Sequence, residues 1–257
     1  MVLEIRPVSS NPGCSVQSIT VNKVYLECNL SATVNSVSPA VCPGTATGSA
    51  SIGTAGAMGA VQFFLDNNPS PFSSGNFNML GAGNHQVIVR DTAGCRDTVT
   101  FTITEPPPIS ITITVTDAKC FGDNSGAIEA AAAGGTPGYT YAWRRCQGGP
   151  VIPGAKAVDL FAGCYGVTVT DSKGCTAIAQ DTIGEPEKFV FSSKQDSVSC
   201  FGGMDGKATV FVSGAMPPYT FLWGNGDKTQ TADSLKAAFH SVTVTDNVGC
   251  QAVTLVQ

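Results

Sequence analysis

The sequence predicts an all-β protein made of tandem sandwich repeats, each closed by a disulfide bond. Three observations lead to this fold class: landmarks that recur about every eighty residues, short segments in which apolar and hydroxyl residues alternate, and 10 cysteines in a chain of 257 residues with few charges. A period of this length indicates one structural unit used several times.

Two cysteines and the residues around them define the repeat. An Asp-x-x-Gly-Cys pattern ends at each of three closing cysteines: Cys95, Cys175 and Cys250. An opening cysteine precedes each of them at a similar distance: Cys42, Cys120 and Cys200. Glu-Pro follows two of the closing cysteines, at Glu105 and Glu185. Because the opening and closing cysteines recur with nearly the same period, the sequence indicates that one fold is used three times.

Short segments within each repeat have the pattern of half-buried strands. Three segments alternate valine or isoleucine with threonine: 111–116, 167–171 and 242–246. Further strands are expected at 127–133, 176–183 and 207–212. The Asp-x-x-Gly-Cys turn joins two of the strands into a hairpin, and its aspartate is expected to cap backbone amides of the turn. Six or seven short strands in about 80 residues predict an immunoglobulin-like (Ig-like) β-sandwich, with Trp143 and Trp223 on the inward face of a central strand.

These landmarks divide the chain into three complete repeats and part of a fourth: residues 1–24, 25–105, 106–185 and 186–257. Cys14 stands in the register of the closing cysteines, so residues 1–24 resemble the closing hairpin of an upstream repeat. No signal-peptide pattern is visible in Met1–Pro7. We therefore expect a window on a longer protein. The proline-bearing linkers at 105–108 and 184–187 favour stiff joints and an extended rod, on the order of 100 Å long for three repeats.

Composition excludes several classes of function. Charged residues are 13% of the chain and the formal net charge is -5, with a pI near 4.9. No run of lysine or arginine is present, so neither nucleic acid nor an anionic membrane surface is an expected partner. No apolar run approaches the roughly 20 residues that a spanning helix needs. Ten cysteines in such a chain indicate an oxidising, extracellular compartment.

The cysteines are expected to form structural disulfides. Within each repeat the opening cysteine is predicted to pair with the closing one: Cys42–Cys95, Cys120–Cys175 and Cys200–Cys250. Each such bond would restrict the unfolded chain by about 4 kcal/mol in the entropy model. Cys146 and Cys164 occur only in the second repeat and are predicted to pair there. Cys28 is the nearest candidate partner for Cys14, unless that partner lies outside this chain.

The second repeat carries the clearest family pattern. It reads Cys120-Phe-Gly, then Gly-Gly-Thr-Pro-Gly-Tyr-Thr-Tyr-Ala-Trp143, then Val-Thr-Val-Thr-Asp-x-x-Gly-Cys175 and Glu-Pro186. This pattern resembles the SprB-type repeat of very large cell-surface adhesins of gliding Bacteroidota. The third repeat matches well, whereas the first reads Cys42-Pro-Gly44 and lacks the tryptophan. The resemblance implies type IX secretion and display as cell-surface filaments used in adhesion or gliding motility, without catalysis.

Members of that phylum O-glycosylate an Asp-Ser/Thr-apolar triplet, so the resemblance also implies modification sites. The chain contains five such triplets, with the hydroxyl residues Thr92, Thr98, Thr182, Ser197 and Ser234. Chance occurrence in a threonine-rich β protein is the alternative. Asn29 begins an N-glycosylation sequon, which carries little weight in a chain that looks bacterial.

Other chemistry is weakly signalled. His85 and His240 precede equivalent strands by two residues, which favours a shared strand-edge position over a catalytic imidazole. The turns 123–126 and 205–206 lack the spaced acidic ligands of a calcium loop, although calcium at a domain junction stays open. Zinc is disfavoured because no Cys-x-x-Cys pair occurs. No cofactor is therefore predicted, and the tryptophans are more consistent with core packing than with a sugar-stacking platform.

The leading prediction is therefore a segment of a repetitive cell-surface adhesin or filament that is not an enzyme. Its expected partners are neighbouring repeats of the same protein and surface glycans or other cells. Self-assembly of the protein into filaments is also expected. A carbohydrate-binding module array of a secreted protein is the alternative, and it would require exposed aromatic residues. A passive spacer that presents a distal domain is a third possibility.

Overall fold

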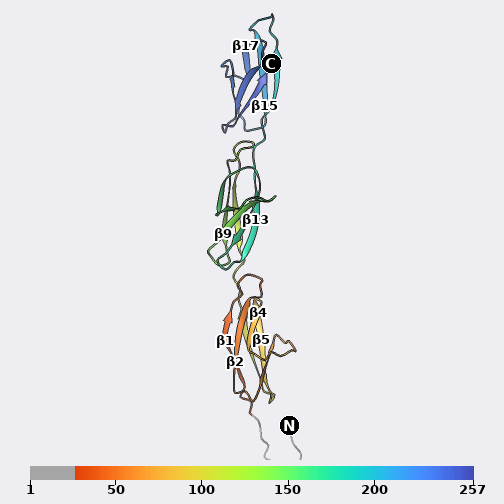
Figure 1. Ribbon diagram of the computed structural model, residues 1–257, viewed down its shortest axis with the longest axis vertical. Coiled ribbons are helices and arrows are strands. Elements are labelled where there is room, and N and C mark those ends of the chain that lie inside the picture. Colours follow the sequence, from red (N-terminus) through yellow and green to blue (C-terminus); the bar gives the residue numbers. More distant parts are fainter. Residues whose placement is uncertain (1–26) are drawn as a thin grey trace, which may run out of the picture. The chain divides into compact units, whose positions relative to one another are not determined.

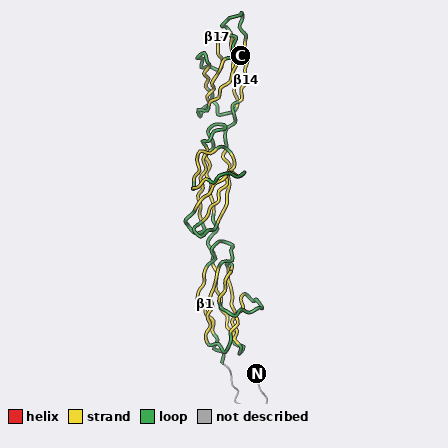
Figure 2. The backbone as a smooth tube through the Cα atoms, in the orientation of Figure 1, coloured by secondary structure: helices red, strands yellow, loops and turns green. Residues whose placement is uncertain are grey.

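The computed structural model describes residues 27–257 (Figure 1). Every regular element in these residues is a β-strand, and Figure 2 shows strands joined by loops from end to end of the described chain. The prediction of a partial repeat at 1–24 and the assignment of Cys14 lie outside the described residues. The strands fall into three consecutive sets, named here the first, second and third repeats.

Strands of similar length follow one another in nearly the same succession in each of the three repeats. The first repeat consists of β1 Ser31–Ser38, β2 Gly48–Ala55, β3 Val61–Leu65, β4 Asn76–Leu80, β5 Gly83–Asp91 and β6 Arg96–Ile103. The second consists of β7 Ser110–Thr116, β8 Gly126–Ala133, β9 Thr140–Arg145, β10 Ile152–Pro153, β11 Lys156–Leu160, β12 Gly163–Thr170 and β13 Thr176–Ile183. The third consists of β14 Val190–Asp196, β15 Gly206–Ser213, β16 Thr220–Trp223, β17 Thr231–Leu235, β18 His240–Thr245 and β19 Gln251–Val256.

Each repeat folds into two antiparallel sheets, and the strand order is the same in all three except that β10 adds an edge strand to one sheet of the second repeat. The first repeat pairs β1-β2-β4 and β3-β5-β6, the second pairs β11-β8-β7 and β10-β9-β12-β13, and the third pairs β14-β15-β17 and β16-β18-β19. In immunoglobulin lettering these are an A-B-E sheet and a C-F-G sheet. The predicted all-β, Ig-like sandwich is confirmed, and the alanines of β8 form a strand rather than a helix.

The alternation in the sequence sets which face of each strand is buried. In β12, Val167 and Val169 are 0% exposed, whereas the threonines between and after them are half-buried. Side chains of a strand point alternately to opposite faces, so the valines meet the other sheet. Trp143 and Trp223 are 0% and 2% exposed. Each packs in the core of its repeat and donates its indole N–H to a backbone carbonyl.

By their contacts the residues separate into two compact units. One comprises residues 27–40 together with Gly44–Glu105. The other comprises Val41–Pro43 and Pro106–Gln257, and it contains two separate hydrophobic cores. The first unit ends at Glu105, the residue at which the sequence places a boundary. The division of the second unit near residue 185 stays a prediction.

A glycine stands at the end of the second strand of every repeat because a backbone carbonyl passes against it. Gly134 has φ +81°, and a Cβ there would lie 2.1 Å from the carbonyl oxygen of Pro108. Gly56 and Gly214 have φ +68° and +76° and face the carbonyls of Asn29 and Lys188 in the same way. Any side chain would have to displace the segment that leads into the repeat.

We expect Gly134→Ala to destabilise the second repeat by about 3 kcal/mol or more, because backbone strain adds to a clash with rigid backbone. Gly174→Ala is the matched control: its φ is +85°, but no atom lies within 4 Å of the added Cβ. It should cost only about 1 kcal/mol. Urea unfolding followed by tryptophan fluorescence in a Trp223→Phe background, where Trp143 is the single remaining tryptophan, measures both. Equal losses in the two variants would contradict this account.

Candidate functional site

The opening cysteines lie in the loop between the first and second strands, beside the end of the last strand. In the first repeat, Ala40 N donates to Thr104 O at 2.8 Å, and Gly44 N donates to Glu105 Oε2 at 2.6 Å. The second repeat repeats both bonds. There Ala118 N reaches Gly184 O at 2.9 Å, and Gly122 N reaches Glu185 Oε2 at 2.7 Å. The glutamate of the Glu-Pro pair thus holds the opening loop at the exit of the sandwich.

The closing cysteines lie in the turn before the last strand, and a buried aspartate organises that turn. Asp171 is 5% exposed. Its Oδ1 accepts from the backbone N–H of Lys173 and Cys175 at 2.8 and 2.9 Å, and its Oδ2 accepts from Thr136 N at 2.8 Å. Asp91 and Asp246 bind the corresponding backbone amides. The sequence predicted that these carboxylates cap turn amides, but not that they are buried or reach the loop after the second strand.

These hydrogen bonds stabilise the charged form of Asp171 and of Asp91. The N–H of Thr136 is the largest influence on Asp171, and with the turn amides it outweighs burial and holds the pKa below its usual range. The N–H of Met58 has the same leading role for Asp91, whose pKa is also lowered. Backbone donors favour an ionised carboxylate because they replace the water that it loses.

The two kinds of cysteine therefore lie at opposite ends of one sandwich. Cys95 precedes β6, whereas the loop of Cys42 is bonded to residues that follow β6. The eight residues of β6 span roughly 26 Å at 3.3 Å per residue. A disulfide needs Cα atoms within about 7 Å. A bond between Cys42 and Cys95 is therefore impossible without unfolding the repeat.

The disulfides instead join the opening loops of the first and second repeats to the closing turn of the repeat that follows. Cys42 bonds Cys175 and Cys120 bonds Cys250, with Cα atoms 5.5 and 5.6 Å apart. The predicted pairs Cys42–Cys95, Cys120–Cys175 and Cys200–Cys250 are wrong, and the prediction that each repeat is closed by its own bond is wrong in the same way. Cysteine spacing showed the period of the repeat but not the end of the sandwich at which each sulfur lies.

The remaining cysteines follow from this offset. Cys28 lies in the segment before β1 and bonds Cys95, with Cα atoms 5.4 Å apart. The predicted Cys14–Cys28 pair is therefore wrong for Cys28. Cys146, just after β9, bonds Cys164 of the neighbouring strand β12, as the sequence predicted. Cys200 is exposed and has no disulfide partner among residues 27–257. The signal that could have revealed the offset was the length of the strand after each closing cysteine.

The two histidines lie near the start of the penultimate strand of their repeats, β5 and β18, at a position that Tyr165 occupies in β12 of the second repeat. Tyr165 O–H donates to the carbonyl of Phe161, four residues earlier, at 3.0 Å. This is the arrangement of the tyrosine corner of Ig-like sandwiches. His85 and His240 stand at the same position, each with Nε2 3.0 Å from a carbonyl four residues earlier. The structure therefore supports the strand-edge interpretation of both histidines.

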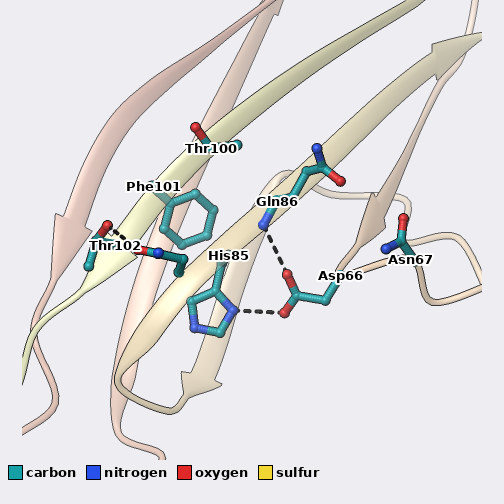
Figure 3. Close-up of a pocket in the computed structure, with 8 residues that line it drawn as sticks. Asp66, Asn67, His85, Gln86, Thr100, Phe101 and Thr102 are labelled. Atoms are coloured by element: carbon teal, nitrogen blue, oxygen red, sulfur yellow. Dashed lines mark hydrogen bonds and ion pairs between the residues drawn. The ribbon is translucent and has the colours of Figure 1, made fainter.

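The surroundings of His85 form a shallow cavity of about 580 Å³ (Figure 3). Its Nδ1 lies 2.7 Å from Asp66 Oδ2, and Asp66 Oδ1 also accepts from Gln86 N (Figure 3). Burial lowers the pKa of His85, but the hydrogen bonds to the Gly81 carbonyl and to Asp66 outweigh it, so the pKa lies above its ordinary value. Both ring nitrogens are engaged, and the ring stacks on Phe101. The imidazole is placed to hold the corner rather than to accept a proton from a substrate.

The suspected oxygen-ligand loops are turns in the structure. The carboxylate of Asp123 accepts from the hydroxyl and N–H of Ser125, and Asp205 accepts from Ser199 N. Among the described residues no three histidine, cysteine, aspartate or glutamate side chains gather as a metal site would require. None of residues 27–257 forms a helix that is long and apolar enough to cross a membrane.

The hydroxyl residues of the five candidate glycosylation triplets lie on the surface. All five are exposed: Thr92, Thr98, Thr182, Ser197 and Ser234. Thr92 additionally donates its hydroxyl to the carbonyl of Met58 at 2.8 Å. The sites are therefore accessible, and their modification stays a prediction.

We expect Asp171→Asn to weaken the fold at pH 7 and to have less effect in acid. The folded pKa of Asp171 is depressed, so its stabilisation is present above the ordinary carboxyl pKa and is lost as the pH falls through the folded value. Thermal unfolding of both proteins from pH 7 to pH 3 should show their melting temperatures converging. Asp159→Asn removes the same charge from an exposed position and is the control. A constant difference at every pH would contradict the assignment.

Comparison with solved structures finds chains that align to this one at low scores. The N-terminal eight Ig domains of the Down syndrome cell adhesion molecule (DSCAM) align at 12% identity and TM-score 0.39, over 83% of this chain and 34% of that one, so the chain spans about a third of its length. A tetra-tandem repeat from the extending region of a large adhesion protein aligns at 11% identity and TM-score 0.27, over 88% of this chain and 72% of that one. At these scores the Ig-like assignment rests on the strand order of the sheets.

Sequence comparison supplies the family. No curated protein sequence matches this chain. The model of the SprB repeat matches residues 112–147 and 192–228, which lie in the second and third repeats. Both segments begin within the first strand of their repeat and include the opening cysteine and the buried tryptophan. Two segments of the chain therefore match the SprB repeat, as the sequence pattern predicted.

Proposed function

We propose that this chain is a load-bearing segment of a repetitive cell-surface adhesin or filament, and that it acts through covalent continuity rather than catalysis. One observation carries the proposal: the disulfides are offset by one repeat, so that the covalent rings of neighbouring repeats overlap. Cys42 lies inside the ring closed by Cys28–Cys95, and Cys120 lies inside the ring closed by Cys42–Cys175. The ring closed by Cys120–Cys250 in turn contains Cys175.

Overlapping rings give a pulling force a short covalent path. From Cys28 the path crosses to Cys95, follows the backbone to Cys120 and crosses to Cys250. Only the backbone between Cys95 and Cys120 is free to extend, and it is about a ninth of the backbone between Cys28 and Cys250. A repeat can therefore lose its hydrogen bonds under tension without releasing its full length of chain. This property suits an element that carries force between a surface and a cell.

The disulfides and the match to the SprB repeat support an extracellular location. Disulfides persist in oxidising compartments, and the SprB repeat is a feature of cell-surface adhesins. We propose export by the type IX route, display in filaments that serve attachment or gliding, and glycosylation at the exposed Asp-Ser/Thr triplets. The proposed partners are neighbouring repeats and the surface glycans or cells to which the filament attaches.

The alternative functions have less support. A carbohydrate-binding array would use exposed aromatic rings, but Trp143 and Trp223 are buried in the cores. A passive spacer needs correct length only, and disulfides confined to single repeats would serve it equally well. Bonds that join one repeat to the next are explained by transmission of force.

We expect the folded, oxidised chain to resist extension when it is pulled in an optical trap by handles attached next to Cys28 and Cys250. The extension between these points should stop at roughly 90 Å, set by the backbone from Cys95 to Cys120, and should reach roughly 780 Å after reduction. Cys120→Ser removes the short path. The remaining route follows the backbone from Cys28 to Cys42 and from Cys175 to Cys250, which predicts roughly 310 Å.

The same measurement distinguishes the offset pairing from pairing within repeats. Bonds Cys42–Cys95, Cys120–Cys175 and Cys200–Cys250 would leave three free segments after Cys28, with a combined extension of roughly 220 Å. That length in the oxidised protein, or no dependence on reduction, would rule out the load-bearing proposal. Cys200→Ser is the matched control and should leave the short extension unchanged.

A further inference from the structure

We propose that the loop of the third repeat that carries Cys200 is a covalent docking site for the closing turn of another SprB repeat. The ligand is an Asp-x-x-Gly-Cys turn, and the new disulfide joins the cysteine of that turn to Cys200. This assignment does not depend on the cellular role proposed above, because it follows from the bonding of the equivalent loops.

The equivalent loops in the same chain already hold such a ligand. Cys42 and Cys120 occupy the position of Cys200 between the first two strands of their repeats, and each bonds the closing cysteine of the repeat that follows. Every other cysteine among residues 27–257 is in a disulfide, whereas Cys200 is exposed and free. The third repeat therefore offers an unbonded opening loop. The chain forms the corresponding disulfide between an opening loop and a closing turn at two other places.

The loop of Cys200 has the conformation of the occupied loop of Cys120. Gly203 N donates to Cys200 O at 2.9 Å, as Asp123 N does to Cys120 O at 3.3 Å. Gly202 has φ +79°, and Gly122 has φ +73°. Ser199 N donates to Asp205 Oδ1 at 3.1 Å and fixes the base of the loop. An incoming turn therefore meets a loop that needs little rearrangement, which lowers the entropic cost of docking.

An aromatic side chain beside the thiol is fully exposed. Phe121, next to Cys120, lines a hollow together with Gly249 and Cys250 of the following closing turn, and it is 54% exposed. Its counterpart Phe201 is 109% exposed. Met204, in the same loop, is 57% exposed. A closing turn docked at Cys200 would cover this apolar surface, which otherwise stays in water.

The bond forms by thiol–disulfide exchange. The Cys200 thiolate attacks a disulfide oxidant such as oxidised glutathione, forms a mixed disulfide and releases one glutathione thiolate. The incoming cysteine thiolate then attacks the Cys200 sulfur, forms the new S–S bond and releases the second glutathione. Two protein thiols lose two electrons and two protons, and one glutathione disulfide becomes two molecules of glutathione.

The chain can supply its own probe. In a Cys14→Ser background, Cys28→Ser frees Cys95 in the closing turn of the first repeat, while Cys200 stays free in the third. Because the two surfaces differ, each molecule should bond the next head to tail and form an open series. After incubation in a glutathione redox buffer, we expect a ladder on a non-reducing gel, with a Cys200–Cys95 peptide identified by mass spectrometry. A monomer, or a dimer joined only by Cys200–Cys200, would overturn the proposal.

Two matched variants separate docking from simple thiol reactivity. Cys95→Ser leaves an equal number of free thiols, at Cys28 and Cys200, but provides no turn cysteine, and it should form no ladder. Phe201→Ser, in the Cys28→Ser chain, should slow cross-linking about tenfold through loss of the aromatic contact. Its reaction with glutathione alone should be unchanged. An unaltered cross-linking rate in Phe201→Ser would show that no docking surface exists.

A second measurement avoids dependence on the folding of Cys28→Ser. In the Cys14→Ser chain with all four disulfides intact, the Cys200 thiolate can attack Cys95 of another molecule and release the Cys28 thiol, without an oxidant. At pH 8 we expect the Cys200–Cys95 peptide together with free Cys28. Exchange at Cys28 rather than Cys95, or exchange spread over all the disulfides, would contradict recognition of the closing turn.

Discussion

The structure of this chain depends on disulfides that join the opening loop of one repeat to the closing turn of the next. Cys42–Cys175 and Cys120–Cys250 each span more than a hundred residues, and in the entropy model a ring of that size restricts the unfolded chain by about 5 kcal/mol. Sandwiches of about 80 residues have modest cores, so such bonds contribute substantially to stability. Their offset also makes the stability of one repeat depend on its neighbour, because neither cysteine bonds another cysteine of its own sandwich.

Two carboxylates place the sulfurs for these bonds. The glutamate of the Glu-Pro pair accepts from the opening loop, and it does so in the two repeats where that pair occurs, through Glu105 and Glu185. The aspartate of the closing turn binds the amide of the closing cysteine itself, as in Asp171 to Cys175. A hydrogen bond to a charged acceptor is stronger than one between neutral groups. The motifs that appear as repeat signatures are therefore the groups that hold each cysteine in position to bond.

The remainder of each repeat follows the physics of Ig-like sandwiches. A tryptophan on the third strand fills the space between the sheets in the second and third repeats, and Phe63 lies in the core of the first. The corner residue at the penultimate strand is Tyr165 in one repeat and a histidine, His85 or His240, in the others. Tyrosine and imidazole both supply a ring to pack and a polar atom to reach a carbonyl four residues earlier. The chemistry of these histidines is accordingly structural.

Local patterns in the sequence determined the period, the strands, the buried tryptophans and the capping role of Asp91, Asp171 and Asp246. These properties depend on alternation and turn preference, which act over a few residues. Cys146–Cys164 could be assigned because no other repeat offers a counterpart. The tertiary structure alone decided the partners of Cys28, Cys42 and Cys120, and it left Cys200 without a disulfide partner among residues 27–257. Spacing along a repeat places both cysteines in one module, but a strand of eight residues separates them by roughly 26 Å. Only the folded chain brings the far end of one repeat to the closing turn of the next.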